Sequence, residues 1–359
     1  MTKEIKARQI CFFFIALLPV TKLFMMPSIL ARTAGEDLWL SALINFLLDL
    51  ITVAVMLACA KKYDTDIYGL IEGAFGKGVA KIIYFVYFAF FMLKAIVPII
   101  EQRDFVELTL YLVMPSPFYF IPFFIVMFYL CTKKPRVFGR AADVLWAGTL
   151  TGLLLLVVLS IKNADFAALL PGFANKNKIF YGSYVSSVWF KDGVYMLFFI
   201  GRFNREKHSS LKIILSFVLS AALTLFTIMI FYCVFTSIAF RQQFALTEIA
   251  KYTTVINNTG RLDYIAILLM LFSNLFALAL PVFFAAKILD KIFSITKPWI
   301  SPLICSLLIA VPVFLLNEFS YSIEFFTLNY LSAFFILAGN ILPLFTVFIK
   351  ERKSEKLKT

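Results

Sequence analysis

The chain has 359 residues, of which 62% are hydrophobic, and 34 Lys and Arg against 21 Asp and Glu give it a formal net charge of +13. A soluble core cannot use so much apolar surface, whereas a bilayer can. The basic residues form short clusters between apolar runs, which argues against a nucleic-acid partner. The cysteines lack paired spacing and the single His208 has no partner cluster, so we expect no metal site, no cofactor and no enzymatic activity.

Apolar windows bounded by charges, Gly or Pro recur along the whole chain. Runs of about 18 or more apolar residues are typical of membrane-spanning helices. The windows predict an all-α integral membrane protein with ten transmembrane helices in a single polytopic domain, residues 1–359. The approximate bounds of these spans are 8–31, 37–61, 79–101, 117–132, 143–161, 184–203, 211–238, 262–293, 299–317 and 321–350.

The loops between the spans indicate the orientation independently. With the N-terminus in the cytoplasm, 23 of the 34 Lys and Arg fall on cytoplasmic loops and tails, eight on the opposite side and three within spans. This asymmetry is what the positive-inside rule predicts for an even number of spans. We therefore expect a multi-pass protein with both termini in the cytoplasm.

Ten spans divide into two sets of five, repeat one at about 8–161 and repeat two at about 184–350. Because five is odd, the second set enters the membrane from the opposite side, and any structural repeat is inverted. Inverted 5+5 repeats with discontinuous helices 1 and 6 are a known plan of secondary transporters, with the ligand site at the interruptions.

The first span contains the stretch ALLPVTKLFMMPS, residues 16–28, in which Lys22 stands between Pro19 and Pro27. Pro19 cannot donate a backbone hydrogen bond and interrupts the helix. With Thr21 and the Lys22 ammonium, the interruption forms a candidate ligand site for an anion such as an α-carboxylate. The simpler alternative is that Lys22 snorkels to the outer surface.

The sixth span has a parallel interruption, Lys191–Asp192–Gly193. Adjacent residues on a helix point about 100° apart, so Lys191 and Asp192 are poorly placed to neutralise each other. Gly193 permits unwinding. We expect these three residues to contribute to the same ligand site. The alternative is that the helix begins after Gly193 and that the charged pair lies in a loop.

Three further charged side chains fall inside spans and are candidates for ion pairing or proton coupling. Asp49 lies at a depth comparable with that of Lys22 on the neighbouring span, so a Lys22–Asp49 pair is one hypothesis. Lys94 and Glu101 are seven residues apart and share a helix face. Other polar or small in-span residues, more typical of helix–helix contacts, are Asn45, Ser273, Asn274, Gly339 and Asn340.

Four segments resemble the endospore germination permease family, the B subunits of bacterial spore germinant receptors. AGEDLWLSALI at 34–44 is similar to the family's AG-x-D-A-W-L-S stretch between the first two spans. GLIEGAFGKGVAKII, from Gly69, is similar to its short helix and GK turn. DFAALLPGF at 165–173 resembles its N-L-L-P element, and LTEIAKYTTVINNTGRLDYIAILLMLFSN at 246–274 resembles the region before span eight.

The resemblance implies the fold of the wider amino acid–polyamine–organocation transporter superfamily. It also implies a subunit that senses a small nutrient, above all an amino acid, in the spore inner membrane together with receptor A and C subunits. Ligand contacts would fall at Pro19–Lys22 and Lys191–Gly193 by their position in the fold. A proton-coupled amino acid permease of the cell membrane, with Asp49 or Asp192 exchanging the proton, is the alternative function. A membrane scaffold with a vestigial cavity is a third.

Overall fold

The computed structural model describes residues 5–63, 65–109, 116–204, 206–251, 263–315 and 327–356. Almost all of these residues are helical, and the two-residue strands β1 (Ile5–Lys6) and β2 (Phe203–Asn204) pair in parallel. The α-helices follow in the order α1 (Ala7–Leu17), α2 (Met26–Ala34), α3 (Leu38–Lys62), α4 (Ile67–Phe75), α5 (Lys77–Thr109), α6 (Ser116–Cys131), α7 (Arg136–Ser160), α8 (Lys176–Ser186), α9 (Tyr195–Phe199), α10 (Ser209–Phe235), α11 (Ala245–Lys251), α12 (Asp263–Phe293), α13 (Ile300–Leu315), α15 (Ser332–Ile336) and α16 (Leu342–Lys356).

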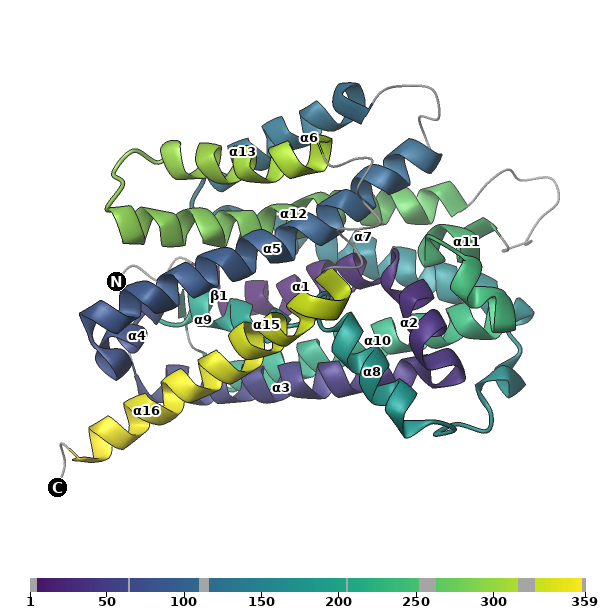
Figure 1. Cartoon of the computed structure of the whole chain (residues 1–359), viewed down its shortest axis with the longest axis horizontal. Helices are drawn as coiled ribbons and strands as arrows, with labels where there is room; N and C mark the ends of the chain where they lie inside the picture. Colours follow the sequence, from purple (N-terminus) through teal and green to yellow (C-terminus); the bar gives the residue numbers. More distant parts are fainter. Residues whose placement is uncertain are drawn as a thin grey trace.

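The long helices run roughly along the long axis of the molecule (Figure 1). α5, α6, α12 and α13 lie together at the top of that view, α3, α10 and α16 lie lower, and the short α1 and α9 lie between them. α12 packs against α5, α6, α7 and α13, whereas α1 packs against α7 and α10. The short interrupted helices therefore occupy the centre of the bundle.

Aromatic rings hold the five-residue helix α9 in place. Phe198 of α9 lies 5.2 Å from Phe91 of α5 and 4.4 Å from Phe284 of α12, measured between ring centroids. Tyr195 of α9 lies 5.8 Å from the ring of Phe13 in α1. Contacts between aromatic rings at these distances stabilise packing beyond the area they bury, so α9 is fixed against three neighbouring helices.

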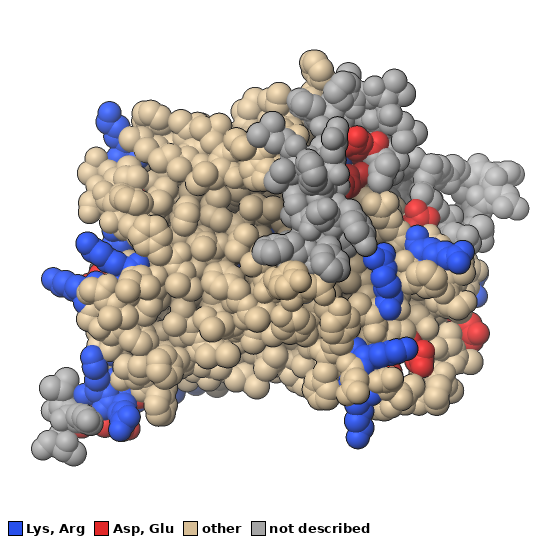
Figure 2. Space-filling model, viewed as in Figure 1, with Lys and Arg blue, Asp and Glu red and all other residues tan. Residues whose placement is uncertain are grey.

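The surface is that of a membrane protein. Six helical segments of the described residues are long and apolar enough to cross a bilayer, namely Met26–Lys62, Lys77–Glu107, Arg136–Asn163, Ser209–Arg241, Met270–Phe293 and Asn329–Glu355. Figure 2 shows the charged side chains of one face gathered towards its two ends, with a broad uncharged band between them. Such a band is what hydrocarbon chains solvate. The prediction of an all-α, multi-pass protein in a lipid bilayer is therefore confirmed.

The structure corrects the bounds of some predicted spans and interrupts the first one as expected. The predicted span 8–31 is broken into α1 and α2, which agrees with a discontinuous first helix. α5 continues past residue 101 to Thr109, and α7 begins at Arg136, seven residues before the predicted span 143–161. The predicted span 184–203 begins eight residues earlier, at Lys176, where the Asn175 side chain caps α8 by accepting from the Lys178 N–H at 3.2 Å. Hydropathy windows miss this start because the first turn of α8 is polar.

Candidate functional site

The first helix break separates α1 from α2. α1 ends at Leu17, a single 3-10 turn follows over Val20–Lys22, and α2 begins at Met26. Pro19 has no N–H to donate, and its carbonyl accepts from the Lys22 N–H at 3.0 Å. The Lys22 ammonium donates to the Leu18 carbonyl at 3.0 Å and is fully buried. Lys22 therefore does not snorkel to the surface.

The second break separates α8 from α9. Lys191 has a left-handed backbone, with φ +71°, and a 3-10 turn over Asp192–Val194 leads into α9. The N–H groups of Lys191 and Asp192 both donate to Asp49 Oδ2 of α3, at 2.8 and 3.0 Å. Both side chains are buried. The pair thus lies between two α-helices in the interior of the protein and not in a surface loop.

Two glycines let the second break approach its neighbours closely. A Cβ on Gly193 would lie 2.9 Å from the Asp49 carbonyl oxygen and 3.0 Å from Thr52 Cβ. A Cβ on Gly339, in the π-helical turn Leu337–Ile341, would overlap the Lys191 side chain. Side chains at either position would push the break away from α3 or from this turn, so the position of Lys191 depends on both glycines.

Asp192 joins the two breaks through ion pairs. Its Oδ2 pairs with the Lys22 ammonium of the first break, and its Oδ1 lies 3.0 Å from the Lys94 ammonium of α5. Lys94 also donates to the Phe190 carbonyl. Because buried ammonium groups are stable only when compensated, Lys22 and Lys94 depend on this carboxylate.

The expected Lys22–Asp49 pair does not form. Asp49 Oδ2 accepts the two N–H groups of the second break, and its Oδ1 accepts from the Asn340 carboxamide at 3.2 Å. The carboxylate is therefore already engaged, while Asp192 faces the first break directly. Asp49 supports the backbone of the break instead of neutralising Lys22.

Lys191 gives the centre an excess of positive charge. Its ammonium donates to Asn45 Oδ1 at 2.7 Å, and the Asn45 amide donates to the Ser183 carbonyl at 2.8 Å. Together with the other charged side chains it completes the charged centre, a set of three ammonium groups and two carboxylates, none more than 5% exposed. The members of the charged centre are Lys22, Lys94, Lys191, Asp49 and Asp192. When all are ionised the centre is net positive, which attracts an anion and repels a further cation.

A small cavity lies beside the charged centre. Thr21, Lys94 and Asp192 line it, and so do Pro98 of α5 and Pro281 of α12. Each proline lies inside a helix and leaves a carbonyl one turn earlier without its usual N–H partner. The cavity measures about 20 Å³, room for about one water molecule. Its wall is mostly apolar, but Thr21, Lys94 and Asp192 give it polar groups that could meet a ligand.

The remaining candidate, Glu101, lies seven residues after Lys94 on α5, about 10 Å along the helix. Trp189 Nε1 donates to Glu101 Oε1 at 2.5 Å, whereas Lys94, which shares its helix face, pairs with Asp192. Pro98 and Pro281 were not among the predicted site residues, although both line the small cavity. The sequence could have indicated them, because a proline inside a spanning helix frees a backbone carbonyl at membrane depth.

Solved structures with a similar fold include that of the manganese transporter of Eremococcus coleocola in complex with an aromatic bis-isothiourea substituted compound. It aligns with a TM-score of 0.56 at 14% sequence identity, over 94% of this chain and 78% of that chain. Two mutant forms of the same transporter align with a TM-score of 0.57 at the same identity and coverage. At this identity the likeness shows the fold alone, so the chain is a membrane protein with a transporter fold.

Sequence comparison identifies the family. The family described as spore germination protein matches residues 4–344, and the chain belongs to it. This confirms the resemblance seen in the sequence, and the transporter fold agrees with the superfamily. No curated protein matches the chain in sequence.

Proposed function

We propose that this chain is the B subunit of a spore germinant receptor and that its charged centre binds a small nutrient through a carboxylate, most simply an amino acid. The observation that carries the proposal is the charged centre itself, where buried ammonium groups outnumber carboxylates at the meeting of two helix breaks. A ligand carboxylate would pair with the ammonium group in excess there, and buried charge is stable only when it is compensated.

The small cavity gives the proposed ligand its place. Lys94 lines it and would donate to the carboxylate, and the Thr21 hydroxyl lies in the same wall. A cavity with room for one water is smaller than an amino acid, so binding requires its walls to move. Pro98 and Pro281 stand in two of those walls, and prolines inside helices are common points of bending.

The same centre disfavours a metal cargo. The similar solved structures are those of a manganese transporter, but a divalent cation at this position would meet three ammonium groups. Within the described ranges, no group of three or more His, Cys, Asp and Glu side chains forms a metal-ligand set. We infer that this chain shares its fold with the manganese transporter but binds a ligand of a different class.

The proposal includes the predicted topology of ten spans in an inverted 5+5 arrangement, with both termini in the cytoplasm. It is supported by the interruptions of the first and sixth predicted spans. The pairing of Lys62 in α3 with Glu351 in α16, at 2.9 Å, joins two helix ends that should lie on the cytoplasmic side. Membership of the spore germination family supports a location in the spore inner membrane and an association with receptor A and C subunits.

Ligand binding to the co-expressed receptor complex tests the proposal. A panel of labelled amino acids would be compared with the methyl esters, which lack the carboxylate. In the Lys94→Met variant, Asp192 keeps Lys22 as its partner, so the fold should persist. We expect affinity for the acid to fall about 10- to 100-fold, as for one lost charged hydrogen bond, and affinity for the ester to change little.

Lys62→Met is the matched control, because it removes an exposed lysine far from the charged centre. Unchanged affinity for every acid in Lys94→Met would refute the carboxylate site. Saturable uptake of an amino acid by the chain alone in liposomes would instead support the permease alternative.

A further inference from the structure

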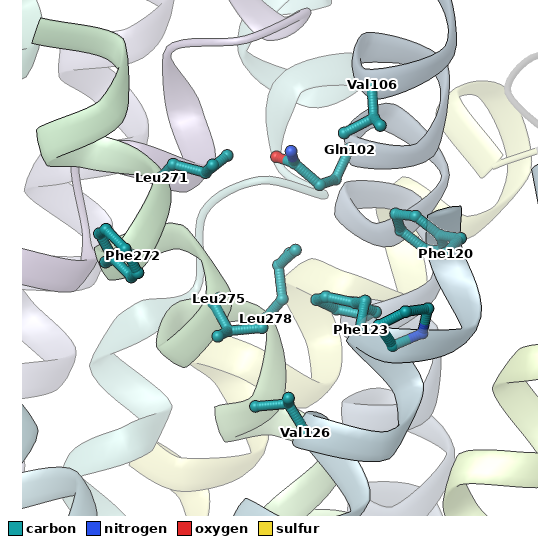
Figure 3. A pocket seen from close by; sticks show the side chains of 10 residues that line it. Gln102, Val106, Phe120, Phe123, Val126, Leu271, Phe272, Leu275 and Leu278 are labelled. Atoms are coloured by element: carbon teal, nitrogen blue, oxygen red, sulfur yellow. The ribbon is translucent and has the colours of Figure 1, made fainter. Parts of the chain in front are cut away.

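An apolar pocket of about 280 Å³ lies between α5, α6 and α12 (Figure 3). Phe123 and Leu275 are among the side chains that form its wall, and Val126 and Phe272 of the same wall are 41% and 56% exposed. Exposed apolar side chains within membrane-spanning helices face hydrocarbon chains. The pocket therefore opens sideways, towards the bilayer.

One polar group interrupts this apolar wall. The carboxamide of Gln102 points into the pocket (Figure 3). Its oxygen accepts from the Asn274 amide, which leaves its own NH₂ group to donate. A partner for Gln102 must therefore be an acceptor.

The depth of the pocket matches that of a lipid. Gln102 lies two residues after Ile100, the last residue of the apolar run of α5, and is followed by the charged Arg103 and Asp104. Val126, at the other end of the pocket (Figure 3), is ten residues from Ser116 at the start of α6, about 15 Å along the helix. The pocket thus runs from near the edge of the hydrocarbon core into its interior, with its hydrogen-bond donor at the shallow end.

We propose that this pocket binds one acyl chain of an ester-linked membrane lipid, whose ester carbonyl accepts a hydrogen bond from the Gln102 amide. The apolar wall excludes a charged headgroup, and the donor at the shallow end matches the carbonyl with which an acyl chain begins. Leu278 lines both this pocket and the small cavity beside the charged centre. A bound chain therefore lies one side chain away from the proposed nutrient site.

The test uses the full chain in phosphatidylcholine vesicles that contain a minor fraction of the same lipid with a photoreactive group in one acyl chain. Adducts are mapped by mass spectrometry after irradiation. Adduct yield at Phe123 and Leu275 should exceed that at the lipid-facing Leu219 of α10 by about fivefold, the ratio expected from one extra neutral hydrogen bond. An ether-linked analogue, which lacks the carbonyl, should lose that excess.

Two matched variants separate the pocket from general lipid contact. Val126→Phe fills the pocket and should lower its adduct yield to that of Leu219, whereas Val218→Phe, at a residue 42% exposed on α10, should not.

Equal adduct yields at the pocket and on α10, or no effect of Val126→Phe, would overturn the lipid site. Equal yields with ester and ether lipids would overturn the role of Gln102. Loss of the label on adding free leucine would assign the pocket to the nutrient instead. No nutrient is needed for the binding itself, so the result is independent of the proposed function.

Discussion

The two helix breaks meet at Asp192 but are made in different ways. The first is set by its own residues, since Pro19 and Pro27 flank it and prevent a continuous helix. The second contains no proline between α8 and α9. Its left-handed Lys191 is held by Asp49 from another helix. The backbone of the first break should therefore tolerate changes in neighbouring helices, whereas that of the second should depend on α3.

The largest effect is expected from Asp49→Leu. The change leaves the N–H groups of Lys191 and Asp192 without their acceptor and removes one of the two carboxylates of the charged centre. We expect the free energy of unfolding to fall by about 3 to 5 kcal/mol, as when one partner of a buried charged network is lost. Reversible unfolding in mixed detergent micelles measures it.

Asp49→Asn is the matched variant, because it keeps one acceptor oxygen for the break and removes only the charge. It should destabilise the protein less than Asp49→Leu. If both variants unfold like the wild type, the second break does not depend on α3 and the comparison fails.

Gly193→Ala should have an intermediate effect. Its Cβ would lie within 3.0 Å of atoms of Asp49 and Thr52, and overpacking at such a site costs about 1 to 3 kcal/mol of unfolding free energy. Gly78→Ala in α5 is the control, since a Cβ there meets nothing within 4 Å. The same unfolding measurement should show a loss for Gly193→Ala alone, and equal stability of the two variants would contradict the close approach to α3.

The smallest effect is expected at the first break. In Pro19→Ala the Lys22 ammonium keeps its bonds to Leu18 and Asp192, so the folded segment should persist. The unfolded chain gains freedom, which lowers the free energy of unfolding by about 0.4 to 1 kcal/mol. A loss as large as that of Asp49→Leu would show that the first break depends on Pro19 alone and that Pro27 and the bonds of Lys22 do not maintain it.

Much of the fold could be predicted from hydropathy, because long apolar runs in a membrane protein leave few alternatives to helices. The predicted spans 37–61 and 211–238 differ from α3 and α10 by no more than three residues at either end. The start of α8 could not be found in this way, since it rests on the cap at Asn175 and not on apolar periodicity. The first residues of the predicted span 321–350 lie outside the described residues.

The site could be predicted as a set of residues but not as a set of contacts. Lys22, Lys191 and Asp192 stood out because charges are costly in apolar spans, and the structure brings them together. The partner of Lys22 could not be predicted, because the sequence placed both Asp49 and Asp192 at a depth in the membrane similar to that of Lys22. Which carboxylate pairs with Lys22 depends on the left-handed backbone at Lys191. It directs Asp192 towards the first break and points two N–H groups at Asp49, which accepts hydrogen bonds from both.

The ion pair between Lys22 and Asp192 joins the two breaks. A double-mutant cycle with Lys22→Met and Asp192→Asn measures this coupling directly as a free energy of unfolding. We predict a coupling of about 2 kcal/mol or more, because the double variant leaves only Lys94 without its carboxylate. Effects that add to within about 0.5 kcal/mol, as for independent sites, would contradict the claim.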